Sequence, residues 1–261
     1  MSLMYNSKND TILTLDQLHN VPLPKALGAR HRPYPFGHFV EQVKESLAIE
    51  GIEVDHEEYA VQKDNMRFFG MMQIQPKPLE GEYISAKDFA LTLGLRGSHD
   101  QRIPRGLALG SQVMVCSNLC FSGNLGVFKT KQTTNIGYRL PSLIRDAVAL
   151  IPQQSERQQI MFDTYKQYDM KRSWGDAALA NMVRIGALSS SQFGTALHEW
   201  DKPSYNEHAE HGEEDGFTAW RLLNATTQAL KPSGDTANMN TVQERSIKVT
   251  NFINEIVGFD Y

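Results

Sequence analysis

EVDHEEYAVQ (residues 53–62) and MRFFGMMQIQ (residues 66–75) are two apolar-rich stretches separated by Lys63, Asp64 and Asn65. The three separating residues have the composition of a hairpin turn, so the two stretches predict a pair of antiparallel strands. Two further apolar stretches, residues 83–95 and 106–118, are bounded by Gly, Ser or Pro and predict additional strands. The first half of the chain is therefore expected to contain a largely antiparallel sheet.

Helical periodicity flanks these strands. Apolar residues recur at helical spacing before them and predict a helix over residues 38–50, which Gly51 ends. A second helix is expected over 140–168, with Pro152 as a possible break, and further helical segments over 176–187, 190–198, 217–230 and 239–257. This order predicts an α+β fold in which an antiparallel sheet in the N-terminal half packs with helices and the C-terminal part is helical.

The length of 261 residues allows one large or two small domains. Prolines interrupt the first 36 residues, which we interpret as an N-terminal arm. Residues 37–261 are expected to form a single α+β domain, strand-rich over 37–138 and helix-rich over 139–261. Neither GxGxxG nor GxxxxGK[ST] occurs, which disfavours a doubly wound nucleotide-binding fold and gives no reason to expect a cofactor.

The overall composition is that of an ordinary globular protein, with 41% hydrophobic and 21% charged residues. No apolar run is long enough for a membrane helix, and the first residues lack the pattern of a secretory signal. We therefore expect a cytoplasmic protein without a membrane partner, in the host cytoplasm if a phage encodes it. Cys116 and Cys120 are expected to be buried free thiols, since such a compartment is reducing.

Residues 93–124, LGLRGSHDQRIPRGLALGSQVMVCSNLCFSGN, form the densest polar segment. Two interpretations stay open: a catalytic or anion-binding loop, or a loop held together by side-chain hydrogen bonds in which Asp100 accepts from backbone amides while His99 projects. Thiol catalysis has little support, because Cys116 lies in an apolar run. The catalytic residue is unknown, and the candidates are Arg96, Ser98, His99, Asp100, Cys116 and Asn118.

The net charge of −4 conceals a local excess of basic residues. The stretch from Arg96 to Arg145 contains one acidic residue, Asp100, and seven basic ones, which form the candidate DNA- or anion-binding set: Arg96, Arg102, Arg105, Lys129, Lys131, Arg139 and Arg145. Such a cluster attracts phosphates through counterion release. Phe128 and Tyr138 could stack on bases, although either could equally belong to the core, and the basic residues could instead pair with acids elsewhere.

Residues 205–216, YNEHAEHGEEDG, are the acidic counterpart. His208 and His211 are weak candidates for a metal site, since three residues apart they would share a helix face; an exposed acidic linker is the better interpretation. In the following segment, FTAWRLLNATTQALK (217–231), Trp220 is expected to anchor a helix on the sheet and Asn224 to satisfy a nearby backbone.

Three stretches together resemble the phage/plasmid-like proteins grouped as domain of unknown function 932: YAVQKDNMRFFGMMQI, the segment from residue 93, and FTAWRLLNATTQAL. The family patterns R-[NG]-S-H-D, V-x-V-C-[SD]-N-[LG] and W-x-x-x-N-A-x-T occur in this order in the chain. The resemblance covers about residues 36–231. Asn124 and Gln228 depart from the pattern. The resemblance implies an origin in a mobile element and work on DNA or host defence, and it supplies no catalytic residue.

These observations favour a phage or mobile-element protein that binds DNA through its basic stretch, for single-strand binding, annealing, recombination or accessory DNA metabolism, as a homo-oligomer. One alternative is a hydrolase or nuclease centred on the Ser98–Asp100 loop. Another is a non-catalytic anti-defence or virion interaction protein. Whether the chain is an enzyme is left open, with the balance against it.

Overall fold

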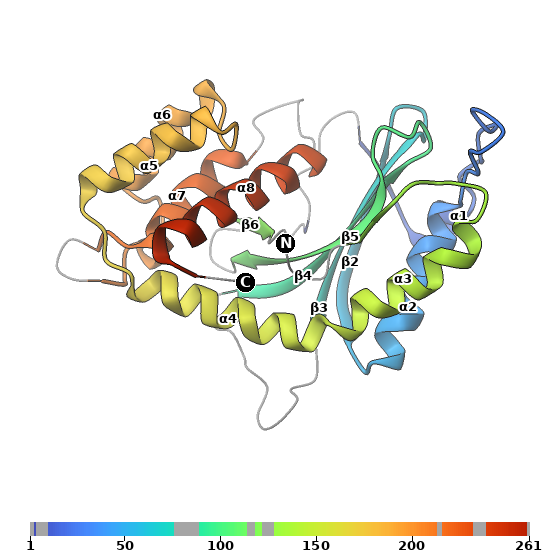
Figure 1. The fold of residues 1–261 in the computed structure, drawn as a ribbon, viewed down its shortest axis with the longest axis horizontal. Helices are drawn as coiled ribbons and strands as arrows, with labels where there is room; N and C mark the ends of the chain where they lie inside the picture. Colours follow the sequence, from blue (N-terminus) through green and yellow to red (C-terminus); the bar gives the residue numbers. More distant parts are fainter. Residues whose placement is uncertain are drawn as a thin grey trace. The chain divides into compact units, whose positions relative to one another are not determined.

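The structure is a computed structural model that describes Leu3 and residues 10–75, 89–113, 118–121, 128–212, 216–231 and 239–259. An antiparallel sheet and helices together confirm the predicted α+β class (Figure 1). The described strands are β1 (Thr11–Leu13), β2 (Glu53–Gln62), β3 (Arg67–Gln75), β4 (Phe89–Ser98), β5 (Arg105–Val113), β6 (Leu119–Phe121) and β7 (Phe128–Thr130). They follow the order β1-β2-β3-β4-β5-β6, and β7 pairs with β5.

The β2–β3 hairpin forms where the sequence predicts it. Tyr59 faces Gly70 across the hairpin, and the turn residues Lys63, Asp64 and Asn65 have φ angles of 52°, 53° and 66°. Asparagine and aspartate tolerate this left-handed backbone better than most residues do. The turn composition therefore has a direct physical reason.

The described helices are α1 (Leu15–His19), α2 (Phe36–Ile49), α3 (Ile136–Ala149), α4 (Ile151–Gln167), α5 (Arg172–Arg184), α6 (Ser190–Asp201), the short 3₁₀ helix η1 (Asn206–His208), α7 (Ala219–Leu230) and α8 (Met239–Val257). The segment expected as one helix over 140–168 is two helices, which meet at Leu150. Pro152 lies in the first turn of α4, where its missing N–H costs nothing, because the first N–H groups of a helix have no partner within the helix. No helix among the described residues has the length and apolarity that crossing a membrane requires.

The chain forms two compact units that interleave along the sequence. Unit 1 comprises Met1–Ser85, Leu91–Gly110 and Leu125–Ser155, and unit 2 comprises Ala86–Ala90, Ser111–Asn124 and Glu156–Tyr261. Their boundaries therefore differ from a division at residue 138. The described part of the first 36 residues belongs to unit 1 and includes β1, which pairs with β2, and α1.

The core of unit 1 lies between α2 and the sheet. The buried face of α2 carries Phe36, Phe39, Val40, Val43 and Leu47, and the rings of Phe36 and Phe39 lie 5.1 and 6.4 Å from that of Phe68 on β3. Buried aromatic side chains contribute most of the apolar area in such a core. Phe39, Val43 and Leu47, whose helical spacing predicts α2, are among the residues that α2 buries in this core.

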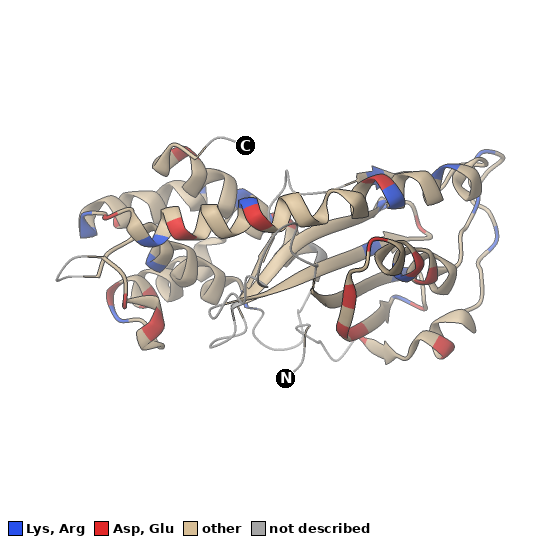
Figure 2. Ribbon diagram, turned by 90° about the horizontal axis from the view of Figure 1, so that it is seen from below, with Lys and Arg blue, Asp and Glu red and all other residues tan. Residues whose placement is uncertain are grey.

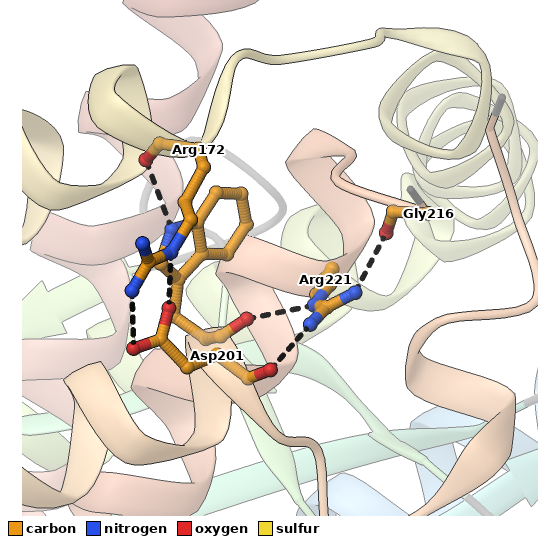
Figure 3. Close-up of polar contacts among 5 residues, drawn as sticks. Arg172, Asp201, Gly216 and Arg221 are labelled. Atoms are coloured by element: carbon orange, nitrogen blue, oxygen red, sulfur yellow. Dashed lines mark hydrogen bonds and ion pairs between the residues drawn. The ribbon is translucent and has the colours of Figure 1, made fainter. Parts of the chain in front are cut away.

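The core of unit 2 surrounds Trp200 and Trp220, which are both buried. Trp200 packs on α5 at Gly175, where an added Cβ would lie 2.1 Å from the indole, so only glycine fits there. Arg221, beside Trp220, is also buried and donates to three carbonyl oxygens: Nε to Trp200 (2.8 Å), Nη2 to Asp201 (3.1 Å) and Nη1 to Gly216 (3.4 Å) (Figure 3). This guanidinium satisfies carbonyls at the end of α6 that no helical N–H reaches.

Candidate functional site

The seven basic residues of the 96–145 stretch divide into two groups. Arg96 and Arg105 are buried at 3% and 0% exposure, respectively. The exposed group consists of Arg102, Lys129, Lys131, Arg139 and Arg145. Only this second group can meet a ligand in solution without rearrangement of the core.

Two loops lie together at one end of the unit 1 sheet. The β2–β3 turn contacts the β4–β5 loop, residues 99–104, because the His99 amide donates to the Met66 carbonyl at 2.8 Å (Figure 1). Arg67 and Asp100 form an ion pair across the same contact, at 3.1 Å. Burial alone would raise the pKa of Asp100, but hydrogen bonds, among them those from the Arg102 amide and from Arg67, lower it. The expected acceptance by Asp100 from a backbone amide is confirmed.

A third segment, residues 27–34, joins this end through residues 132–133, which follow β7. His31 pairs with Thr133 as an isolated β-bridge, and the Arg32 amide donates to the Gln132 carbonyl at 3.1 Å. These contacts bring exposed Arg30 and Arg32 beside Lys131, although about 100 residues separate them in the sequence. Both arginines lie in the segment that the prolines predict as an N-terminal arm, so the charge pattern of residues 96–145 does not include them.

We call this surface the basic end; its exposed cations are Arg30, Arg32, Lys63, Arg102, Lys129 and Lys131. The same loops contain two acids, Asp64 and Asp100, and Asp100 is paired with Arg67. Figure 2 shows Lys and Arg in several loops of this unit, whereas Asp and Glu gather on α2 and β2. Unit 1 is therefore electrostatically polarised.

The buried side chain of Gln132 connects three segments of the basic end. Its side chain is buried and makes three contacts: Nε2 donates to the Ser98 carbonyl at 2.6 Å, and Oε1 accepts from the Tyr34 amide at 2.9 Å and lies 3.4 Å from Nδ1 of His99. One amide thus connects β4, the 27–34 segment and the β4–β5 loop. A buried polar network of this kind orders the elements it joins.

His99 does not project into solvent; it is 0% exposed and stacks on Phe36 with ring centroids 4.1 Å apart. Because Gln132 turns its oxygen toward Nδ1, that nitrogen carries the proton of the neutral ring. Burial, followed by the charge of Arg105, lowers the pKa of His99 to about 4. The ring is therefore neutral at physiological pH.

Arg105 occupies a cage of aromatic rings. Its Nη2 donates to the Tyr34 carbonyl at 2.8 Å, and its Cζ lies 4.9–5.6 Å from the ring centroids of Phe39, Phe36 and Tyr34. Burial lowers the pKa of Arg105 to about 9, so it is charged at neutral pH. Cation–π attraction offsets part of the desolvation cost. Arg105 thus holds the start of α2 against β5.

Two further catalytic candidates, Ser98 and Asn118, are buried, and neither forms an acid–base pair that solvent can reach within the described residues. Ser98 is buried and bonds Ile103 through both its hydroxyl proton and its oxygen. Asn118 belongs to unit 2, where its Nδ2 lies 3.3 Å from the Asn224 carbonyl and 3.4 Å from Oδ1 of Asn224. Cys116 lies outside the described residues, and Cys120 is buried with its pKa raised by burial to about 11. A general base must reach its substrate.

Metal-ligating side chains gather elsewhere than expected. His208 is buried against Tyr205, with ring centroids 5.2 Å apart. Burial lowers the pKa of His208 to about 4. Within the described residues, the group of three side chains whose ligand atoms lie close enough to share a metal ion is His19, His38 and Glu41.

Replacing Gln132 by Leu is expected to lower the free energy of unfolding of unit 1 by about 2 kcal/mol, because buried partners at Tyr34 and Ser98 lose their hydrogen bonds. Hydrogen exchange at the Tyr34 amide measures the effect directly, and its protection should fall. Gln153→Leu, at an exposed position of α4, is the control and should leave this protection unchanged. Equal protection in the two variants would contradict the role of Gln132.

Comparison with known proteins adds no relative: no family model, curated protein or solved structure matches the chain.

Proposed function

We propose that the chain binds a nucleic acid through the basic end. The observation that carries the proposal is the convergence of exposed cations from four separate segments on one end of unit 1, with Asp100 already neutralised by Arg67. A surface of this kind attracts a phosphate backbone regardless of sequence and releases its counterions. Binding would therefore weaken as the salt concentration rises.

Two features favour a nucleic acid over other anions. The cations are distributed over several loops, which suits a chain of phosphates better than a single small anion. Tyr138, in the first turn of α3, is 90% exposed and follows Lys131 closely in the sequence, so its ring is available to stack on a base. The resemblance to phage/plasmid-like proteins implies work on DNA or on host defence, and the first of these agrees with a nucleic acid as the ligand.

The test is fluorescence anisotropy with a labelled single strand and with the duplex of the same sequence, at low and rising salt. The variant Arg102→Glu/Lys129→Glu/Lys131→Glu should weaken binding by about tenfold or more and flatten the salt dependence. Arg30→Glu/Arg32→Glu should weaken it as well, which distinguishes the basic end from the 96–145 stretch alone.

The matched control is Arg184→Glu/Lys202→Glu, which reverses an exposed arginine and an exposed lysine of unit 2. It should retain most of the affinity. Absence of binding to either strand form at low salt would refute the proposal, and so would equal losses in the control and in the variants of the basic end.

A further inference from the structure

We propose that His19, His38 and Glu41 form a binding site for a divalent transition metal of the zinc class. His19 ends α1, while His38 and Glu41 lie three residues apart on α2 and so share one face of the helix. One ligand atom from each side chain lies within 4.8 Å of the other two. Small side-chain rotations would bring the three atoms to a common metal.

The contact between His19 and Glu41 is not a hydrogen bond. Nε2 of His19 lies 2.9 Å from Oε1 of Glu41, yet Nε2 makes no hydrogen bond in the structure. An N–H aimed at the carboxylate would satisfy both atoms at this distance. The two side chains form an ion pair when the ring is protonated. A zinc ion held by both, with bonds of about 2.0–2.2 Å, would need to separate the two atoms only to about 3.3 Å.

Gly37 provides the second, independent observation. A Cβ at this position would lie 2.6 Å from Nδ1 of His19, so the imidazole rests directly on the backbone of α2. Glycine inside a helix costs roughly 0.5–1 kcal/mol relative to alanine. Because glycine has no side chain, the His19 ring can come close to α2, and its centroid lies 5.5 Å from that of the His38 ring.

The ligand set selects the class of metal. Two imidazoles with one carboxylate suit Zn²⁺ and its neighbours, whereas Mg²⁺ and Ca²⁺ prefer oxygen ligands. Three protein ligands leave a fourth position for water, and the exposure of His38 and Glu41 gives the ion a path from solvent. A bound ion would link α1 to α2 and so close the loop that carries Arg30 and Arg32.

The test uses the untagged, chelator-treated full chain, with Zn²⁺ titrated by calorimetry and Co²⁺ followed by its visible d–d absorption. About one ion per chain should bind. His38→Ala and Glu41→Gln should each weaken the affinity about tenfold or more, and circular dichroism checks that these exposed substitutions leave the fold intact.

His56→Ala is the matched control, because His56 lies 3.6 Å from Glu58 in a pair outside any described group of three ligands. It should bind zinc as the unchanged chain does. Failure of the unchanged chain to bind Zn²⁺ stoichiometrically, or equal affinity in His38→Ala and His56→Ala, would overturn the proposal.

Discussion

Arg221→Met is expected to lower the free energy of unfolding of unit 2 by several kcal/mol, since hydrogen bonds from a charged donor are worth about 1.5–3 kcal/mol each. The substitution removes three such bonds and leaves the carbonyls of Trp200, Asp201 and Gly216 without this donor. It also removes the guanidinium from the face of Phe217, where Cζ lies 4.2 Å from the ring centroid. Methionine restores only the apolar stem of the side chain.

Urea unfolding followed by tryptophan fluorescence measures this loss without interference from unit 1. The three tryptophans, Trp174, Trp200 and Trp220, all belong to unit 2. Arg172→Met is the control: it breaks the ion pair with Asp201, in which Nε and Oδ1 are 2.7 Å apart, but the Arg172 side chain is 61% exposed (Figure 3). Ion pairs on the surface contribute little to the free energy of unfolding. Equal destabilisation by the two substitutions would contradict the role assigned to burial.

Acid is expected to destabilise both units through one buried histidine in each. The pKa values of His99 and His208 are about 4, below the usual histidine value, because burial disfavours the charged ring. Between the ordinary pKa near 6.5 and about 4, the unfolded chain binds a proton that the folded chain does not. The stability these rings contribute is complete at neutral pH and is lost as the pH falls, by about 2 kcal/mol for each histidine at about pH 5.

The measurement compares unfolding free energies at about pH 7.5 and about pH 5. His208→Gln should reduce the pH dependence in unit 2, read by tryptophan fluorescence. His99→Gln should reduce it in unit 1, read by hydrogen exchange of the β2–β3 amides. Each substitution should act on its own unit. An unchanged pH dependence in either variant would show that the corresponding ring is protonated in the folded state.

Strands β2 to β5 and the long helices could be predicted because each carries its pattern locally. The β2–β3 hairpin follows from its turn residues, and α2 from the spacing of Phe39, Val43 and Leu47. β1, β6, β7 and α1 could not be predicted, since elements of three to five residues are too short for periodicity. The capping box of Thr14 and Gln17 was the available signal for α1.

The candidate site was only partly predictable, because long-range contacts assemble it. The cluster over 96–145 includes Arg102, Lys129 and Lys131, which the structure shows to be exposed. Whether an arginine faces solvent is decided by the opposite element, and the rings that enclose Arg105 come from residues 34–39. Likewise, the spacing of His38 and Glu41 is visible in the sequence, but the contact of His19 with them is not.

The interleaving of the two units constrains how the protein can be made and divided. The chain passes from one unit to the other at residues 85–86, 90–91, 110–111, 124–125 and 155–156. On a ribosome, unit 1 acquires its last segment only when residue 155 emerges, and by then unit 2 holds just two short pieces of itself. No single truncation yields either unit intact. Fragment complementation at a surface loop, rather than domain excision, is therefore the appropriate way to study the two units apart.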